Sequence, residues 1–177
     1  MDFSVDVKQQ ELIDLAKTIA EKEIAPRALR IDKSGVMDEE LLKVMKESGM
    51  TQLSVPKEYG GAGIDLLTGA LISEQLSKGC AGVATICAAN SLASFPILFA
   101  GSDMQKRDLF DCLNRGGMAC FALTEPGAGS DAGAVSCRAE KVEGGYILNG
   151  TKCFITNAPI ADKITLFANT REGGGIR

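Results

Sequence analysis

One segment of the sequence constrains the fold more than any other: residues 79–102 contain no charged side chain. A helix of this length could span a lipid bilayer. However, the segment is rich in alanine, includes Asn90 and Pro96, and has no belt of Lys or Arg on one side. Mean hydropathy of the whole chain is only +0.07. We therefore expect a helix buried on nearly all sides of a bundle, with a kink or an end at Pro96.

Helical patterns surround this segment in the first two thirds of the chain. We expect helices over residues 8–24, 38–49, 65–78, 79–102 and 102–116. Apolar residues recur at helical spacing in the first of them, and Pro26 disturbs its end. Asp38 is a natural N-cap followed by two glutamates, and Gly49 is a plausible C-cap. Ser102 and Gln105 have the spacing of a capping box.

After Gly117 the pattern changes from helical to extended. We expect strands over residues 118–123, 135–142, 146–148, 152–156 and 163–168. Turn signals stand at residues 143–145 and 149–150. The strands give no sign of closing into a complete sheet, so we expect the chain to stop partway through a domain. The predicted fold class is α+β, with an all-α domain at 1–116 and part of a β-domain at 117–177.

Composition excludes several classes of function. The net charge is −4 and the 19 Lys and Arg are scattered, which argues against a nucleic-acid partner. Because the chain contains no histidine, it has no imidazole base and no Ser-His-Asp or Cys-His nucleophile. The six cysteines form no CxxC pair, and the N-terminus has no signal-peptide character. We therefore expect reduced thiols in a cytoplasmic protein without a membrane partner.

The glycine-rich segment 122–133 carries the clearest chemical signal. Gly127, Gly129 and Ala132 satisfy the Rossmann pattern GxGxxG/A. That pattern needs a helix after it, whereas the residues after 133 predict another strand. Two interpretations stay open from the residues alone. The loop binds an anionic pyrophosphate through its amides and the hydroxyls of Thr124 and Ser130, or it is a connection without a ligand.

Two motifs resemble those of the acyl-CoA dehydrogenase family. The run at 124–131, Thr-Glu-Pro-Gly-Ala-Gly-Ser-Asp, is similar to the family's flavin-lining signature. The run at 148–157, Leu-Asn-Gly-Thr-Lys-Cys-Phe-Ile-Thr-Asn, resembles its second motif, and residues 56–61 also agree. The resemblance covers essentially all 177 residues. It implies the N-terminal helical domain and the start of the barrel-like middle β-domain, without the C-terminal domain.

The resemblance implies FAD as the cofactor and contacts from two segments. The implied contacts are Phe121, Leu123, Thr124, Gly129, Ser130, Phe154, Ile155 and Thr156. Leu123 and Thr124 would hydrogen-bond the pyrimidine edge, and the Thr156 hydroxyl would lie near flavin N5. Ser130 would contact the FAD pyrophosphate or the CoA part of the substrate, with Gly129 giving the backbone room. Many members carry Trp where Phe154 stands, and Phe121 replaces a tyrosine or another residue.

The implied activity is α,β-dehydrogenation of an acyl-CoA thioester with hydride transfer to FAD N5. An electron-transferring flavoprotein would accept the electrons, and complete members assemble as homodimers or homotetramers. The family's base is a glutamate of the C-terminal domain, so no catalytic residue is assigned and neither Glu74 nor Glu125 takes that role. Alternatives are a flavoprotein oxidase or monooxygenase of the same fold, or a non-catalytic FAD- or CoA-binding module. Acyl chain length and the direction, dehydrogenation or enoyl-CoA reduction, stay open.

Overall fold

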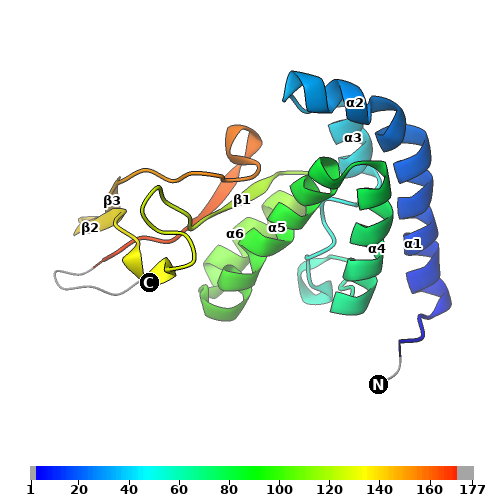
Figure 1. Ribbon diagram of the computed structural model, residues 1–177. Coiled ribbons are helices and arrows are strands. Elements are labelled where there is room, and N and C mark those ends of the chain that lie inside the picture. Colours follow the sequence, from blue (N-terminus) through cyan, green and yellow to red (C-terminus); the bar gives the residue numbers. More distant parts are fainter. Residues whose placement is uncertain (1–2, 171–177) are drawn as a thin grey trace.

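The computed structural model describes residues 3–170. A helical bundle is followed by a small β region that lies to one side of it (Figure 1). The helical elements are α1 Val7–Ile19, η1 Ala20–Ile24, α2 Ala25–Ser34, α3 Glu39–Glu47, η2 Lys57–Tyr59, α4 Leu66–Gly79, α5 Ala81–Ala100 and α6 Asp103–Asn114. The β region contains β1 Ala119–Ala122, η3 Ala132–Ala134, β2 Arg138–Val142, β3 Gly145–Asn149, η4 Ala158–Ile160 and β4 Lys163–Leu166. The predicted fold class is confirmed.

Local capping chemistry sets where several helices begin. The side chain of Asp38 accepts a hydrogen bond from the Leu41 amide at 2.9 Å, as the N-cap of α3. That bond is the main reason why the pKa of Asp38 is lowered. Ser102 and Gln105 form a complete capping box at the start of α6. These two helix starts are confirmed.

The first helix differs from the prediction. It does not end near Pro26, because a π-helical turn, η1, leads directly into α2. The amide of Ala25 donates to the carbonyl of Ala20, five residues back. Pro26 therefore falls in the first turn of a new helical segment, where a proline's missing N–H is tolerated. The sequence prediction of a break at Pro26 was wrong for this reason.

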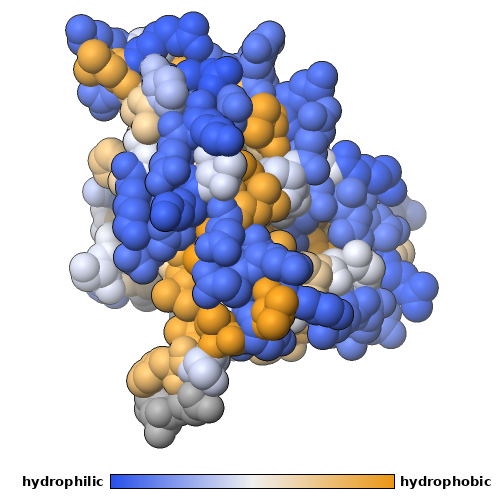
Figure 2. All heavy atoms as spheres, turned by 90° about the vertical axis from the view of Figure 1, so that its right-hand side faces the viewer, coloured by the Kyte–Doolittle hydropathy of each residue, from blue (hydrophilic) through white to orange (hydrophobic). Residues whose placement is uncertain are grey.

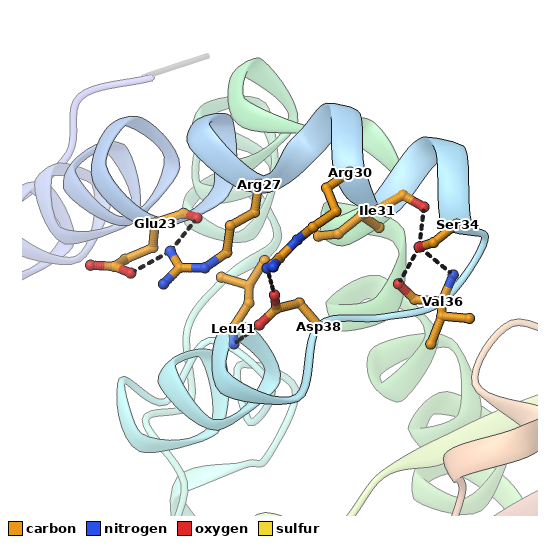
Figure 3. A network of polar contacts seen from close by, with 8 residues as sticks. All are labelled: Glu23, Arg27, Arg30, Ile31, Ser34, Val36, Asp38 and Leu41. Carbon is orange, nitrogen blue, oxygen red and sulfur yellow. Dashed lines mark hydrogen bonds and ion pairs between the residues drawn. The ribbon is translucent and has the colours of Figure 1, made fainter.

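Polar contacts hold α2 to its neighbours, since α2 has no buried residue. Arg27 Nη1 donates to Glu23 Oε2 at 2.7 Å, one turn earlier (Figure 3). The guanidinium of Arg30 reaches across to the carboxylate of Asp38 at the start of α3. Exposed ion pairs of this kind contribute little to stability. The partly buried side chain of Ile31 also packs α2 against the buried apolar residues of the bundle.

Two clusters of buried apolar side chains form the helical core. The first joins α1, α3, α4 and the start of α5, and includes Ile24, Leu41 and Ile72. The second joins α5, α6 and β1 around Phe110, whose ring lies 4.8 Å from that of Tyr59. The surface seen from the α1 side is largely hydrophilic, with groups of hydrophobic side chains between (Figure 2).

Helix α5 is the wall that the two parts share. It packs against α4 and α6 in the bundle and against β1 and β4 in the β region. Among the described residues it is the one helix long and apolar enough to cross a membrane by length and composition, yet 39% of its most apolar 18-residue window is buried within the chain. It is not buried on nearly all sides, as the sequence suggested, because Leu92 and Phe99 are exposed. Nor does it end at Pro96, which lies inside the helix.

The β region consists of two small sheets. Strands β1 and β4 pair in parallel, with Phe121 opposite Thr165. Strands β2 and β3 form an antiparallel hairpin, with Gly144 at φ +81° in the turn. The predicted strand 135–142 begins only at Arg138, because residues 132–134 form a 3₁₀ turn.

The predicted strand at 152–156 was wrong. This stretch is irregular, and Phe154 has a left-handed backbone with φ +56°. Its polar groups bind residues 123 and 124 instead of a neighbouring strand. Gly150, just before it, packs so closely on Cys137 that a Cβ would lie 2.7 Å from the Cys137 Cα. The proposed domain boundary near Gly117 falls in the linker between α6 and β1.

We expect Phe110→Ala to lower the free energy of unfolding by about 3–5 kcal/mol, because it empties a fully buried site in the second cluster. The matched control is Met104→Ala on the same helix, whose side chain is 78% exposed. It should change the free energy by no more than about 0.5 kcal/mol. Urea denaturation followed by circular dichroism measures both. Equal losses in the two variants would contradict this account of the core.

Candidate functional site

The two sequence motifs lie side by side. The backbone amide of Cys153 donates to the carbonyl oxygen of Thr124 at 3.0 Å. The Lys152 ammonium donates to the carbonyl oxygen of Leu123 at 2.8 Å. The segment 121–131 and the segment 152–157 are therefore parts of one site, although more than twenty residues separate them in the sequence.

The glycine-rich segment folds back on itself in a tight turn. The amide of Glu125 donates to the carbonyl of Ala128 at 3.0 Å, and the amide of Ala128 donates to the carbonyl of Glu125 at 3.1 Å. Beyond this turn, Gly129 and Ser130 are exposed, and a Cβ added to Gly129 would meet no atom within 4 Å. The Rossmann interpretation does not fit, because a short 3₁₀ turn and a strand follow the loop.

Glu125 is a buried carboxylate with a full set of donors. Its side chain is 3% exposed. One oxygen accepts from the amide and the hydroxyl of Ser136, at 2.7 and 2.6 Å. The other accepts from the amide of Cys137 at 2.9 Å and from the ammonium of Lys152 at 2.7 Å. Burial raises the pKa of Glu125, but these four hydrogen bonds outweigh it and lower the pKa to about 2.

This ion pair fastens the two motifs together. Lys152 is also largely buried, with a side-chain exposure of 10%, and its ammonium bonds both Glu125 and the Leu123 carbonyl. A carboxylate held in this way is ionised and has no free lone-pair direction for a substrate proton. The expectation that Glu125 is not a base is consistent with this geometry. Both residues stand inside the quoted motifs, but their spacing in the sequence did not disclose that they pair.

Phe154 is the most unusual residue of the second segment. Its left-handed backbone is an outlier for a bulky residue, and its side chain is 93% exposed. Strained backbone of this kind persists only where the surroundings hold it, and it concentrates at functional sites. Ile155 and Thr156, which follow, are half-buried. The segment therefore presents an aromatic ring and a hydroxyl beside the glycine-rich loop.

The other predicted contact residues divide into two groups. The hydroxyls of Thr124, Ser130 and Thr156 have no hydrogen-bond partner within residues 3–170. Phe121, in contrast, is engaged in packing, with its ring 5.0 Å from that of Phe167. Leu123 likewise packs on the small apolar cluster of the β region. The three hydroxyls are thus unpaired within the described residues, whereas the two apolar side chains already pack on apolar neighbours.

Two asparagines that the sequence reasoning did not assign lie behind the site. Asn157 Nδ2 donates to the carbonyls of Ile86 and Ala119 at 2.9 and 3.1 Å. Asn90 Oδ1, on α5, accepts from the amide of Ala119 at 2.8 Å, and its Nδ2 donates to the carbonyl of Thr51 at 2.8 Å. Both side chains are buried. Two sequence features pointed towards them: Asn90 is a polar residue inside the charge-free helix, and Asn157 is the last residue of the second motif.

A cleft of about 1160 Å³ opens between α4, α5 and the loop that precedes α4. Small side chains of α5, among them Ala88 and Ser91, line one wall. Ala70 and Ser73 of α4 line another, and Phe95 closes part of the rim. The lining is mostly apolar with a few hydroxyls, as is usual for a small-molecule site.

Glu74, the other carboxylate considered in the sequence, lies outside the site. It is on α4, with a side-chain exposure of 58%, and it pairs with Lys78 at 3.3 Å, one turn later. This is an ordinary exposed i,i+4 ion pair. Glu74 is therefore an ordinary exposed, ion-paired carboxylate.

The chain thus combines a helical bundle with a small β region, in which a glycine-rich loop lies beside an exposed aromatic residue. The chain belongs to the acyl-CoA dehydrogenase family. The family's N-terminal domain matches residues 6–117, and its middle domain matches residues 120–177.

Curated relatives include both reductases and dehydrogenases. The 3-(aryl)acrylate reductase of Clostridium sporogenes is 45% identical over 174 residues, which is 96% of this chain and 46% of that protein. Acryloyl-CoA reductase (NADH) of Anaerotignum propionicum is 39% identical over 100% of this chain and 46% of its own length. Human short-chain specific acyl-CoA dehydrogenase is 42% identical over 91% of this chain and 40% of its own. The chain thus spans less than half the length of these relatives.

Solved structures show the same architecture. Butyryl-CoA dehydrogenase from Megasphaera elsdenii superposes with a TM-score of 0.89 at 38% identity, covering 99% of this chain and 48% of that one. A chain in the structure of the electron-transferring flavoprotein of Acidaminococcus fermentans gives 0.90 at 38%, with the same coverage. The FAD complex of PigA gives 0.84 at 34%, covering 99% and 47%.

We predict that Glu125→Gln flattens the acid dependence of stability. The folded pKa of about 2 lies below the ordinary value of 4.5, so Glu125 stabilises the fold above pH 4.5 and this contribution is lost as the pH falls towards 2. Removing the carboxylate should reduce the slope of unfolding free energy in this window by up to about 1.4 kcal/mol per pH unit. Urea denaturation at several pH values measures it.

The control for this prediction is Glu140→Gln, which removes the same charge from an exposed position on β2. The control should keep the steep fall, because Glu125 is still present in it. Equal slopes for wild type and Glu125→Gln between pH 4.5 and 2 would show that the buried ion pair does not carry this contribution.

Proposed function

We propose that the chain is part of an FAD-dependent enzyme that interconverts acyl-CoA and α,β-unsaturated acyl-CoA thioesters. The observation that carries this proposal is the pairing of segments 123–125 and 152–153. It gathers the exposed Phe154 ring and the free hydroxyls of Thr124 and Thr156 in one place. Membership of the acyl-CoA dehydrogenase family supports it.

The residues of the site fit FAD. An aromatic ring with 93% exposure on a strained backbone suits an apolar wall for a ring system, and the open space at Gly129 suits close approach of a phosphate. We propose that Phe121, Leu123, Thr124, Gly129, Ser130, Phe154, Ile155 and Thr156 hold this cofactor. When bound, FAD supplies the acceptor for the hydride of the substrate's β-carbon.

The chain's own contribution is to bind and orient. The Thr156 hydroxyl, unpaired within the described residues, would donate a hydrogen bond to the edge of the flavin where the hydride arrives. Leu123 and Thr124, fixed by Lys152 and Cys153, would present backbone and hydroxyl groups to the pyrimidine edge. Ser130 would bind a phosphate of FAD or of the CoA portion. Lys152 keeps Glu125 ionised and occupied.

We propose that an acyl-CoA is the substrate and that an electron-transferring flavoprotein is the redox partner. The small side chains on α5, such as Ala88 and Ser91, leave room in the cleft between α4 and α5 for an acyl group. A matched chain of the Acidaminococcus fermentans electron-transferring flavoprotein structure supports the partner. We propose that the base that removes the α-proton is not among the described residues. We also propose that the whole protein assembles as a homo-oligomer.

Enoyl-CoA reduction is the second candidate. Two of the relatives, at 45% and 39% identity, are reductases. The two directions use the same bound groups, because the reverse reaction returns a hydride to the β-carbon and a proton to the α-carbon. They differ in which partner supplies or removes electrons.

The visible spectrum of the purified protein, with FAD added, tests the proposal. Under anaerobic conditions, butyryl-CoA or an aryl-substituted acyl-CoA should bleach the flavin bands of a dehydrogenase. Chemically reduced protein should regain those bands when it receives the matching enoyl-CoA. Flavin bands that respond to neither ligand would favour a binding module or an oxidase. Failure to bind FAD at all would overturn the proposed function.

We expect Thr156→Ala to slow flavin reduction while leaving the fold intact. The substitution removes one half-buried hydroxyl that has no partner within residues 3–170, so stability should change by less than about 1 kcal/mol. Loss of a hydrogen bond made during hydride transfer should lower the reduction rate by about tenfold or more. Stopped-flow absorbance measures the rate. The control is Thr85→Ala at an exposed position of α5, and equal rates in all three proteins would exclude the role of Thr156.

A further inference from the structure

We propose that Asn157 and Asn90 are positioning residues, which hold the segment Phe154–Thr156 in register with α5 and β1. The proposal rests on the proposed function for its consequence, FAD binding, but its geometry stands on the described contacts alone. Neither side chain is among the predicted cofactor contacts.

The two side-chain amides converge on the backbone of a single residue, Ala119. Asn90 Oδ1 accepts from the amide of Ala119, while Asn157 Nδ2 donates to the carbonyl of Ala119. Asn157 Nδ2 also donates to the carbonyl of Ile86 in α5 and lies 3.4 Å from Asn90 Oδ1. Helix α5, the first residue of β1 and the end of the second motif are thereby tied together. The side chains are 0% and 6% exposed, so water does not compete for these bonds.

Asn157 is suited to its place by backbone and by side chain. Its φ is +70°, a left-handed conformation that asparagine tolerates better than most residues. Its Nδ2 faces carbonyl oxygens only: those of Ile86, of Ala119 and of the Asn90 side chain. Aspartate would keep the shape and the backbone preference but would set a charged acceptor against these acceptors. The contacts therefore require an amide and not merely a left-handed residue.

Residues 152–157 form a short arch, which hydrogen bonds hold at both ends. At one end, Lys152 and the Cys153 amide bind the carbonyls of residues 123 and 124. At the other end, Asn157 binds α5 and β1. Only the three residues 154–156 lie between, and Phe154 among them has the strained backbone. Fixing both ends of so short a segment leaves it few alternative conformations, which is how the strain of Phe154 is maintained.

Three variants test the inference: Asn157→Gly, Asn157→Asp and the control Asn114→Ala. Asn114 also uses its Nδ2 to bind a backbone carbonyl, that of Tyr59 at 2.6 Å, but in the helical bundle. Hydrogen exchange of the FAD-free protein should show faster exchange at the amides of Cys153 and Ala158 in both Asn157 variants. Both amides are bonded within or beside the arch in the wild type. Exchange in the centre of α4 should not change.

The same variants should weaken FAD binding about tenfold or more, whereas Asn114→Ala should stay within about twofold of wild type. Flavin fluorescence titration measures the affinity for FAD. Urea denaturation measures the free energy of unfolding of each variant, so that affinities are compared between variants of similar stability. Wild-type affinity in Asn157→Gly would show that only the left-handed backbone matters and would overturn the role of the amide. Equal weakening in the control would reduce the effect to general destabilisation.

The two proposals fail in distinguishable ways. A wild-type protein that binds no FAD overturns the proposed function, while hydrogen exchange still decides whether Asn157 holds the arch. Slow exchange at Cys153 and Ala158 in every variant overturns the positioning role, even where FAD binds normally. If Asn157→Asp does not fold, Asn157→Gly decides alone.

Discussion

The backbone of Ala119 is the point on which the arrangement of the two parts depends. Its N–H and C=O are both bonded by buried side-chain amides, one from α5 and one from the second motif. An unpaired buried peptide group would be costly, so the two parts cannot slide past one another without losing both bonds. Thr165 adds a third fastening, because its hydroxyl donates to the carbonyl of Ala93 in α5 at 2.7 Å. Helix α5 thus fixes where both β1 and β4 lie relative to the helical bundle.

A second constraint lies within the β region, where Glu125 and Lys152 form a buried ion pair. Such pairs often add little net stability, since desolvating two charges offsets their attraction. Their consequence here is positional: three donors to Glu125 come from Ser136 and Cys137 and the fourth from Lys152, so the carboxylate ties the loop both to the start of β2 and to the second motif. The carboxylate of Glu125 therefore makes all of these hydrogen bonds on the inner side of the loop. Its outer side then carries Ser130 and the open backbone of Gly129, free to face a ligand.

Features decided by local chemistry could be predicted from the sequence, and features decided by distant partners could not. The caps at Asp38 and Ser102 depend on residues three positions away, so the pattern disclosed them. The irregular course of residues 152–156 depends on carbonyls of residues 123 and 124, so the apolar run was mistaken for a strand. The continuation of α2 beyond Pro26 depends on a π-helical turn, for which the sequence offers no clear signal.

The candidate site shows the same division. The motifs in the sequence pointed to the correct family. The sequence did not disclose which residues hold these motifs in place. Asn90 was noticed only as a polar interruption of an apolar helix, and its partners are Thr51 and Ala119, far away in sequence. Phe121 and Leu123, implied as cofactor contacts, are half-buried among apolar neighbours. Resemblance identifies which segments meet a ligand, and contacts are needed to separate the residues that touch it from those that position it.

The charged residues of the site indicate which steps of the proposed reaction they can take part in. Since the chain has no histidine, a base for the α-proton must be a carboxylate with a free oxygen, a lysine or a residue on another segment. Glu125 has no such freedom, because four donors hold it in the ionised form, and Glu74 lies on an exposed helix face in a pair with Lys78. What the described residues offer instead is a wall with an aromatic ring, hydroxyl donors and a fixed backbone. Holding and orienting a ligand is therefore the role that we propose for these described residues in the reaction.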